Sequence, residues 1–289
     1  MIKSKGSKAA DWFIVLCCVF LILICLLPLV NVLARSLSSP SALIRNEVFL
    51  WPKGLNLDAY KMVLGTSKYT HSLGWTAILT VICTCVSMFM TIICAYPLTY
   101  DNLKGRRFFN SAIILTMYFS AGTIPNYLLL KDLGMLNTVS VLILPNCLSV
   151  FNVIILRSFF YGIPESLRES AELDGAGPIR IMVSIYLPLS TSVLATLALF
   201  YAVGRWNGFS DALMYVKNEK IFPIQLLLYN ILQSVTSVDV ATQEGFTTPG
   251  LGDTIKAATV MFATVPILLI YPWLQRYFIT GVTIGAVKG

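Results

Sequence analysis

The sequence predicts an all-α integral membrane protein with six transmembrane helices, and three observations carry this prediction. Hydrophobic residues make up 56% of the 289 positions and charged residues only 12%. The mean hydropathy is +0.76, which is far above the range of soluble domains. The apolar residues also form uncharged runs at 12 to 34, 69 to 100, 108 to 130, 133 to 156, 181 to 204 and 257 to 275. Each run is close to or above the ~20 residues that a helix needs to cross ~30 Å of hydrocarbon.

The basic residues of the short loops predict the orientation of these spans. The loops that should face the cytoplasm hold Lys3, Lys5, Lys8, Lys104, Arg106, Arg107, Arg157, Arg168 and Arg180. The other segments, 35 to 72 and 217 to 256, are longer, and acidic residues offset their basic ones. The first run has 23 uncharged residues and no A-x-A site after it, so we expect an uncleaved span rather than a signal peptide. Both termini are therefore expected in the cytoplasm.

A polar segment at 164 to 188 separates the fourth and fifth runs. Pro164 is suited to a first helical position, and Glu165 then complements the positive end of the helix dipole. The spacing places one charged stripe on this helix, consisting of Glu165, Arg168, Glu169 and Glu172. Ile163, Leu167 and Ala171 lie toward the other side, so the helix is predicted to be amphipathic.

A turn is predicted directly after this helix. Asp174, Gly175, Ala176 and Gly177 gather turn-forming residues, and Pro178 can open a second helix that continues into apolar sequence. The expected structure is a helix-turn-helix on the cytoplasmic side, with Pro188 marking the return to the membrane. Such a unit fits a cleft on a soluble partner. The alternative is an ordinary solvated loop, because a charged stripe often indicates no more than that.

The rest of the chain offers no catalytic constellation. All seven cysteines lie in apolar runs without metal-ligand spacing, and the single histidine, His71, lies near a span boundary. We therefore expect neither a metal site nor catalytic residues. The chain also has no G-x-x-x-x-G-K-[ST] loop for nucleotide phosphates, and its spans lack the buried acids or broken, paired halves typical of ion-coupled carriers. An ion-coupled secondary carrier, or a channel, is nevertheless the alternative from a different class of protein.

Residues 169 to 188, ESAELDGAGPIRIMVSIYLP, carry a family resemblance. They resemble the EAA signature of ABC importer permeases, E-A-A-x-x-x-G-x9-I-x-L-P, in which only Ser170 departs. Five further segments are similar to the second, maltose-type permease of carbohydrate ABC importers, closest to the subgroup for acidic or plant-wall oligosaccharides. These segments are 95 to 110, 116 to 138, 157 to 177, Trp206 with Asn207, and 271 to 289, the last with glycines at 281, 285 and 289.

The resemblance implies a single permease domain over 1–289 with the type I importer fold, in the bacterial cytoplasmic membrane. The EAA loop would transmit ATP-driven movement to the bundle through Glu165, Arg168, Glu169, Ala171, Glu172, Asp174, Gly175 and Ala176. Partners would be a different permease chain, two ATPase subunits that use ATP and Mg, and an external binding protein that meets the face containing 217–253. The cargo would be an oligosaccharide, taken in by alternating access. A peptide or phosphonate is the alternative solute.

Candidate substrate contacts lie near the fifth span. In the family's layout this span covers about 189 to 213, which places Arg205 at membrane depth, where a charge must face a cavity. Its guanidinium suits a carboxylate, and Trp206 and Asn207 supply a stacking face and hydrogen-bonding groups. Alternatively, Arg205 is an interface anchor or forms an ion pair with an acid such as Asp211. Two aromatic residues, Tyr118 and Tyr127, are expected to line the path or to pack in the membrane.

Overall fold

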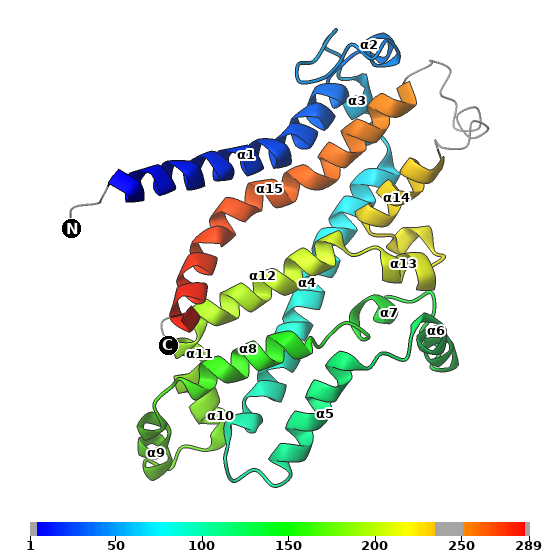
Figure 1. The fold of residues 1–289 in the computed structure, drawn as a ribbon. Helices are drawn as coiled ribbons and strands as arrows, with labels where there is room; N and C mark the ends of the chain where they lie inside the picture. Colours follow the sequence, from blue (N-terminus) through cyan, green and yellow to red (C-terminus); the bar gives the residue numbers. More distant parts are fainter. Residues whose placement is uncertain (1–4, 235–250, 287–289) are drawn as a thin grey trace. The chain divides into compact units, whose positions relative to one another are not determined.

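The computed structural model describes residues 5–234 and 251–286, and every regular element in these ranges is a helix (Figure 1). The chain divides into two compact units. The first consists of Met1–Thr70 with Leu227–Pro266, and the second of His71–Leu226 with Ile267–Gly289.

The first unit begins with α1 (Lys5–Ser36), a long apolar helix whose described side chains are largely exposed. Two short helices follow, α2 (Pro40–Ile44) and α3 (Asp58–Gly65). The start of α15 (Leu251–Ala286) packs on α3 through a small core of Ala59, Val63, Ile255 and Ala258. The Tyr60 and Ser36 hydroxyls lie 2.8 Å apart and join α3 to the end of α1. The packing of this unit is therefore centred on α3, whereas the described side chains of α1 are mostly not covered by other parts of the unit.

The second unit is a bundle built on α4 (Ser67–Ala95), whose first residues belong to the first unit. After the short 3₁₀ helix η1 (Pro97–Thr99), α5 (Arg106–Tyr118) and α6 (Thr123–Asp132) form a pair bent by 115°. Gly122 precedes α6 with φ +90°, a conformation that a side chain would oppose. Helices α7 (Ser140–Ile143) and α8 (Val150–Tyr161) come next.

The polar segment and the fifth apolar run follow as one broken path. It contains α9 (Glu165–Leu173), α10 (Pro178–Ile181), the π-helix η2 (Met182–Tyr186), α11 (Leu187–Leu189) and α12 (Thr191–Asn207). The part before α12 and α12 itself meet at 84°. Helices α13 (Ser210–Tyr215), η3 (Glu219–Ile221) and α14 (Ile224–Ser234) complete the described chain before α15.

The spans agree with the sequence prediction only in part. Within the described residues, three unbroken helices are long and apolar enough to cross a membrane, or up to five if each bent pair counts as one span. The run at 133 to 156 is not one helix, which corrects the prediction. It contains α7 and the start of α8, separated by Leu144–Ser149, because Pro145 lacks a backbone N–H and Asn146 favours a turn.

The C-terminal helix also extends further than predicted. We expected the last span to end at 275, with the glycines beyond it, but α15 continues to Ala286 and includes Gly281 and Gly285. Gly289 lies outside the described residues. The helix expected at 221 to 233 corresponds to α14, whereas Gln243 and most of the TTPGLGD cluster of the same external stretch lie outside the described residues.

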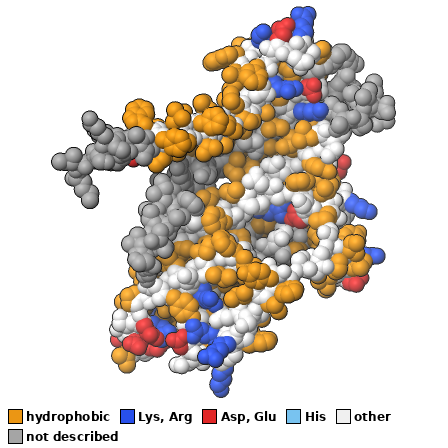
Figure 2. Space-filling view, in the orientation of Figure 1, with side chains coloured by type: hydrophobic (Ala, Val, Ile, Leu, Met, Phe, Trp, Pro, Cys, Tyr) orange, Lys and Arg blue, Asp and Glu red, His pale blue; other side chains and the backbone are white. Residues whose placement is uncertain are grey.

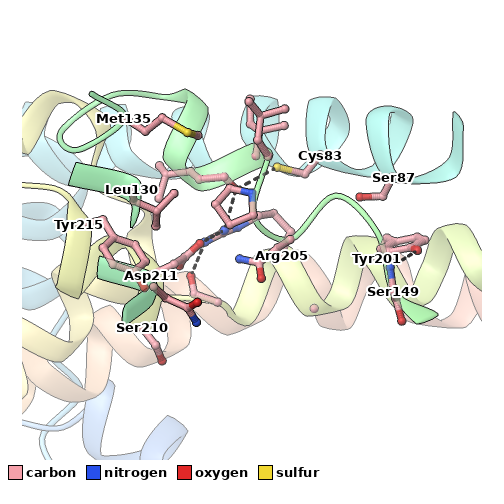
Figure 3. Close-up of a pocket in the computed structure, with 18 of the residues that line it drawn as sticks. Cys83, Ser87, Leu130, Met135, Ser149, Tyr201, Arg205, Ser210, Asp211 and Tyr215 are labelled. Atoms are coloured by element: carbon pink, nitrogen blue, oxygen red, sulfur yellow. Dashed lines mark hydrogen bonds and ion pairs between the residues drawn. The ribbon is translucent and has the colours of Figure 1, made fainter. Parts of the chain in front are cut away.

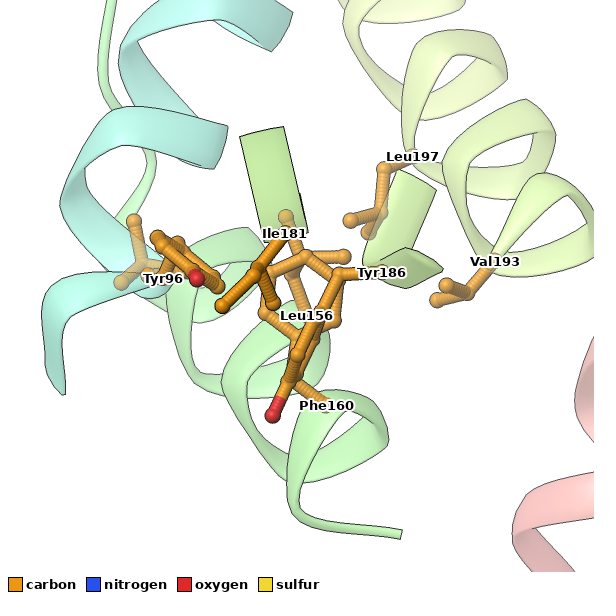
Figure 4. Close-up of a cluster of buried hydrophobic side chains, with 9 residues drawn as sticks. Tyr96, Leu156, Phe160, Ile181, Tyr186, Val193 and Leu197 are labelled. Carbon is orange, nitrogen blue, oxygen red and sulfur yellow. The ribbon is translucent and has the colours of Figure 1, made fainter. Parts of the chain in front are cut away.

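The core of the second unit lies where the polar segment joins the bundle (Figure 4). Side chains from the end of α4, from α8, from α10 with η2, and from α12 converge there. They are Ala95, Tyr96, Val153, Leu156, Phe160, Ile181, Tyr186, Val193 and Leu197, each at most 5% exposed. Burial of apolar surface thus anchors both ends of the segment from α10 to α12.

Candidate functional site

The polar segment forms the helix-turn-helix that its sequence predicts, and we call residues 164–188 the coupling segment. Pro164 is extended (φ −57°, ψ 130°) and precedes the helix rather than occupying its first position, so α9 begins one residue later, at Glu165. The Glu165 carboxylate then lies in the first turn, where it complements the helix dipole. Glu169, Glu172 and Asp174 are exposed, and Ala171 is half-buried toward the core.

The turn after α9 depends on the backbone of Gly175, which has φ +76°. The Ala176 N–H donates to the Ala171 carbonyl at 2.9 Å, and the Gly175 N–H donates to the Glu172 carbonyl at 3.0 Å. This pair of bonds is a Schellman motif, which ends a helix with a left-handed residue. A Cβ on Gly175 would meet no atom within 4 Å. Backbone conformation, rather than lack of space, therefore favours glycine here.

Arg168 does not extend the exposed charged stripe as predicted. Its side chain is only 16% exposed, and its guanidinium lies 4.9 Å from the ring centre of Tyr100. It pairs with Glu165 and, at 3.5 Å, with Glu172. Burial is the largest influence and would lower the pKa of Arg168, but the charges of Glu165 and Glu172, with Tyr186, raise it above its ordinary value. Arg168 thus remains charged and ties α9 to the end of α4.

Two exposed apolar side chains flank the turn, and the sequence analysis did not single them out. Leu173 ends α9 with 90% exposure, and Ile179 in α10 is 75% exposed. Figure 2 shows charged side chains gathered over one end of the second unit. Leu173 lies outside the apolar face that Leu167 and Ala171 define on this helix, and this position could have predicted its exposure. Exposed apolar groups within a charged surface are typical of a protein-docking site.

A pocket of about 1190 Å³ lies within the second unit (Figure 3). Its lining comes from α4, α6, the α7–α8 region, α12 and α13. Amide and hydroxyl groups are frequent in it, with aromatic rings between them. Those polar and aromatic residues are Ser87, Asn126, Asn146, Ser149, Phe151, Asn152, Phe200, Tyr201, Ser210 and Tyr215. Leucine, isoleucine and methionine side chains form much of the remaining wall, and an apolar lining with a few polar groups is typical of small-molecule sites.

Arg205 lines this pocket, but its guanidinium is occupied by neighbours. It forms a two-point ion pair with Asp211, in which one nitrogen–oxygen distance is 3.1 Å, and the two side chains are 7% and 12% exposed. The guanidinium also donates to the Gly208 carbonyl at 2.9 Å and to the Leu142 carbonyl at 3.2 Å. The ion pair that the sequence left as an alternative is therefore present at the corner between α12 and α13, and the hydrogen bond from Arg205 to the Leu142 carbonyl joins this corner to α7.

The structure does not bring the other predicted substrate contacts into this pocket. Trp206 is buried beside Arg205, and Asn207 is exposed and donates to the Val203 carbonyl at 3.0 Å. Tyr118 ends α5 with 76% exposure. Tyr127 packs on Tyr215, a lining residue, with ring centres 6.1 Å apart. Of the five predicted residues, only Arg205 lies in the wall.

Tyr201 is a lining residue that the sequence analysis missed. Its hydroxyl lies 2.7 Å from the Thr91 hydroxyl and accepts from the Ser149 N–H at 3.1 Å. It thereby connects α12 with α4 and with the start of α8. Asn152, only 4% exposed, lines the same pocket. Polar residues inside an apolar run, as Asn152 is inside 133 to 156, were the signal available from the sequence.

Within the described residues, the long apolar helices, the exposed helix-turn-helix and the internal pocket together fit a membrane transport subunit. The chain belongs to the family of binding-protein-dependent transport system inner membrane components, whose model matches residues 75–284. Members are permease subunits of ABC importers, so this chain is a multi-pass membrane transport subunit rather than an enzyme, and the ATPase is a separate chain.

Individual relatives match over nearly the whole length. Protein LplC of Bacillus subtilis is 42% identical over 92% of this chain and 90% of its own. The polygalacturonan/rhamnogalacturonan transport system permease protein YtcP of the same organism is 40% identical, covering 92% and 94%. A solved bacterial ABC transporter involved in import of the acidic polysaccharide alginate has a chain with 29% identity and a TM-score of 0.89, covering 96% and 99%.

Proposed function

We propose that this chain is one of two different permease subunits of an ABC importer for oligosaccharides. The similarity to YtcP and to the alginate transporter supports carbohydrate as the cargo. The remaining partners would be two ATPase subunits, which use ATP and Mg, and an external binding protein. A solved alginate importer of the same fold, 16% identical with a TM-score of 0.59, was crystallised with a periplasmic binding protein.

The coupling segment is the observation on which this proposal mainly rests. Its turn presents Leu173 and Ile179 on a charged surface, while its other side is anchored in the core by Ile181 and Tyr186. A unit that is exposed on one side and fixed on the other transmits a push from a soluble partner into the bundle. Closure of the ATPases on ATP would move the segment and switch the pocket between the two sides of the membrane.

This function requires the coupling segment and both termini to face the cytoplasm. The basic residues of the loops support that orientation, since Lys104, Arg107 and Arg180 all lie at or near the same end of the second unit as α9. We treat residues 1–289 as one transmembrane permease domain that contains the coupling segment.

The pocket would hold the sugar through neutral groups. The only charged residues in its lining, Arg205 and Asp211, pair with each other, so the wall carries little net charge. Hydroxyl, amide and aromatic side chains then supply the contacts, which suits the ring faces and hydroxyls of a saccharide. Direct contact of the sugar with Arg205, Trp206, Asn207, Tyr118 or Tyr127 stays a prediction.

Reconstitution of the complex tests this function. The chain is co-expressed with its partner permease and ATPase, inserted into liposomes, and supplied with binding protein and labelled oligogalacturonide, alginate oligosaccharide or maltotetraose. We expect at least one of these sugars to be taken up. This uptake should require ATP on the side of the membrane where the ATPase lies. Uptake that proceeds without ATP and follows an ion gradient would refute the proposal. ATP-driven uptake of peptides or phosphonates, with none of sugars, would refute the assignment of the cargo.

A further inference from the structure

Resting on the proposed function, we propose that Tyr96 and Tyr100 are positioning residues that connect the coupling segment to α4. Tyr96 directly follows the last residue of α4, and Tyr100 lies after η1. We call the chain of hydrogen bonds from Tyr100 through Tyr96 to the Pro178 carbonyl the tyrosine link. Its role is to carry movement of the coupling segment into α4, separately from the covalent path into α12.

The direction of the tyrosine link follows from the chemistry of its groups. The Tyr96 hydroxyl lies 2.9 Å from the Pro178 carbonyl oxygen and 2.6 Å from the Tyr100 hydroxyl. A carbonyl only accepts, so the single proton of Tyr96 is donated to Pro178. Tyr100 must then donate to Tyr96. Removing the Tyr96 hydroxyl therefore breaks both bonds, whereas removing that of Tyr100 breaks one.

Tight packing makes the tyrosine link stiff. The Tyr96 ring is 5% exposed and meets Tyr186 and Phe160 edge to face, with ring centres 5.1 Å and 6.3 Å apart. Phe160 and Tyr186 are themselves 5.3 Å apart and at most 4% exposed. Figure 4 shows these three rings converging from α4, α8 and η2. Because the ring is held in place, a movement of Pro178 that carries the Tyr96 hydroxyl with it must also move α4.

A second contact reaches the same tyrosines from α9. Arg168 lies over the ring of Tyr100 at 4.9 Å while it pairs with the acidic residues of its own helix. The end of α4 therefore holds the coupling segment at two points, one on each side of the Gly175 turn. Two points fix the orientation of the helix-turn-helix as well as its position.

The covalent path out of the coupling segment is less direct. It runs through the π-helix η2 and α11, and then turns by 84° at Ser190 into α12. Helix irregularities of this kind are places where a chain can flex. Helix α4, in contrast, continues unbroken for 29 residues and contributes Cys83 and Ser87 to the pocket wall. The tyrosine link therefore gives the coupling segment a stiff route to the pocket.

The experiment compares Tyr96→Phe, Tyr100→Phe and Tyr161→Phe in the reconstituted complex. Tyr161 is the control, because its hydroxyl also donates to a carbonyl at this end of the bundle, that of Leu98 at 3.0 Å, and accepts from Arg106, while neither of these bonds involves residues 164–178. The readouts are labelled oligosaccharide imported per ATP hydrolysed and amide hydrogen exchange over residues 164–178. The probe is whichever of the three test oligosaccharides the unmodified complex imports.

We expect Tyr96→Phe to lower the amount of sugar imported per ATP by at least roughly two- to tenfold, the range that a single neutral hydrogen bond represents. Tyr100→Phe should lower it less, and Tyr161→Phe should leave it unchanged. Exchange over 164–178 should speed up in the same order. Parallel loss of uptake and ATP hydrolysis, at a constant ratio, would indicate a merely structural role and overturn the inference.

Three further outcomes are decisive. If Tyr96→Phe reduces the amount of assembled complex, Tyr100→Phe decides, because its ring remains over Arg168; an unchanged ratio in that variant overturns the inference. If the unmodified complex shows no ATP-driven uptake, the proposed function fails, and the inference fails with it. Normal coupling in the unmodified complex and in all three variants would refute the tyrosine link alone.

Discussion

At the scale of single residues, Gly175 and Arg205 show two different constraints. Gly175 is defined by its backbone, since φ is +76° and no atom crowds the position. Arg205 is defined by its partners, which take up both terminal nitrogens of its guanidinium and leave its charge balanced by Asp211. Gly175 permits the turn after α9, and Arg205 holds α12 and α13 together.

Gly175→Leu should uncouple transport from ATP hydrolysis. A side chain in the left-handed region costs about 1–2 kcal/mol, which is enough to disfavour the Schellman turn without unfolding the bundle. We expect a roughly five- to thirtyfold lower uptake at normal membrane insertion. Gly177→Leu is the control, because Gly177 has an ordinary φ of −73° and equally open space. Equal uptake in both variants would contradict a backbone role, as would normal coupling in Gly175→Leu.

Breaking the Arg205–Asp211 pair should be strongly destabilising. Removal of one partner of a buried pair typically costs about 3–5 kcal/mol, so Asp211→Asn and Arg205→Gln should both reduce the thermal stability of the complex. Arg205→Lys should rescue little, because lysine cannot make two parallel bonds to a carboxylate.

Uptake by the same variants separates the two roles of Arg205. If Arg205 only holds the pocket wall together and does not touch the sugar, Arg205→Gln should reduce initial uptake of acidic and neutral oligosaccharides of equal length by the same factor. A selective loss of the acidic sugar would instead assign Arg205 to direct contact with a carboxylate. Initial rates for oligogalacturonide and maltotetraose provide the comparison.

At the scale of elements, the coupling segment combines one face for a partner with another for the core. Ile181 and Tyr186 are buried in the bundle, whereas Leu173 and Ile179 point into the surroundings. Anchoring in the core and contact with a partner thus depend on neighbouring residues of short helices. Substitutions on the exposed face should leave folding intact.

Leu173→Asp and Ile179→Asp should weaken the association with the ATPase. Fully burying such a side chain contributes about 1.5–3 kcal/mol, and a buried, unpaired carboxylate adds a further cost. We expect at least a tenfold lower recovery of ATPase during purification of the complex, with the permease pair still intact. Ser166→Asp is the control, since it adds the same charge at an exposed position in the first turn of α9. Undiminished recovery in the two apolar variants would remove these residues from the interface.

Much of this element could be predicted from the sequence. The start of α9, the turn at Gly175 and the second helix at Pro178 all follow from local rules of capping and backbone conformation. The inward position of Arg168 could not, because it depends on Tyr100, which is 68 residues away in the sequence. The Arg205–Asp211 pair was foreseeable as an alternative, since both residues lie in one short stretch. The contact of Arg205 with the Leu142 carbonyl, in contrast, depends on tertiary packing.

At the scale of the whole molecule, the proposed function makes this chain one half of a transport pathway. The described side chains of α1 are mostly exposed, and they have no covering within the first unit. Lipid or a second permease must cover them. The number of spans is hard to predict from the sequence for a related reason. Broken or bent helices, such as α5 with α6, rely on neighbouring groups to satisfy their backbone hydrogen bonds, and the sequence of the span does not show those neighbours.

The chain expressed alone should therefore neither bind ATP nor transport. It lacks a phosphate-binding loop, and the broken helices of its bundle would face lipid with unsatisfied polar groups. We expect its amount in the membrane to rise severalfold on co-expression with the partner permease. Calorimetry with ATP and uptake assays on the isolated chain provide the measurements. Nucleotide binding or transport by that chain would contradict the division of labour between the subunits.

The π-helix η2 has a consequence for how this gene can change. A π turn holds one residue more than an α turn, so deletion of a single residue between Met182 and Tyr186 would leave a regular helix rather than a gap. Because both kinds of turn complete a full circle, the residues before and after η2 would keep their faces, and Pro178 would still face Tyr96. Deletion of one residue within the regular helix α12 would instead rotate everything before it by about 100° relative to everything after it. A frame-preserving loss of one codon should consequently be tolerated better within Met182–Tyr186 than within Thr191–Asn207.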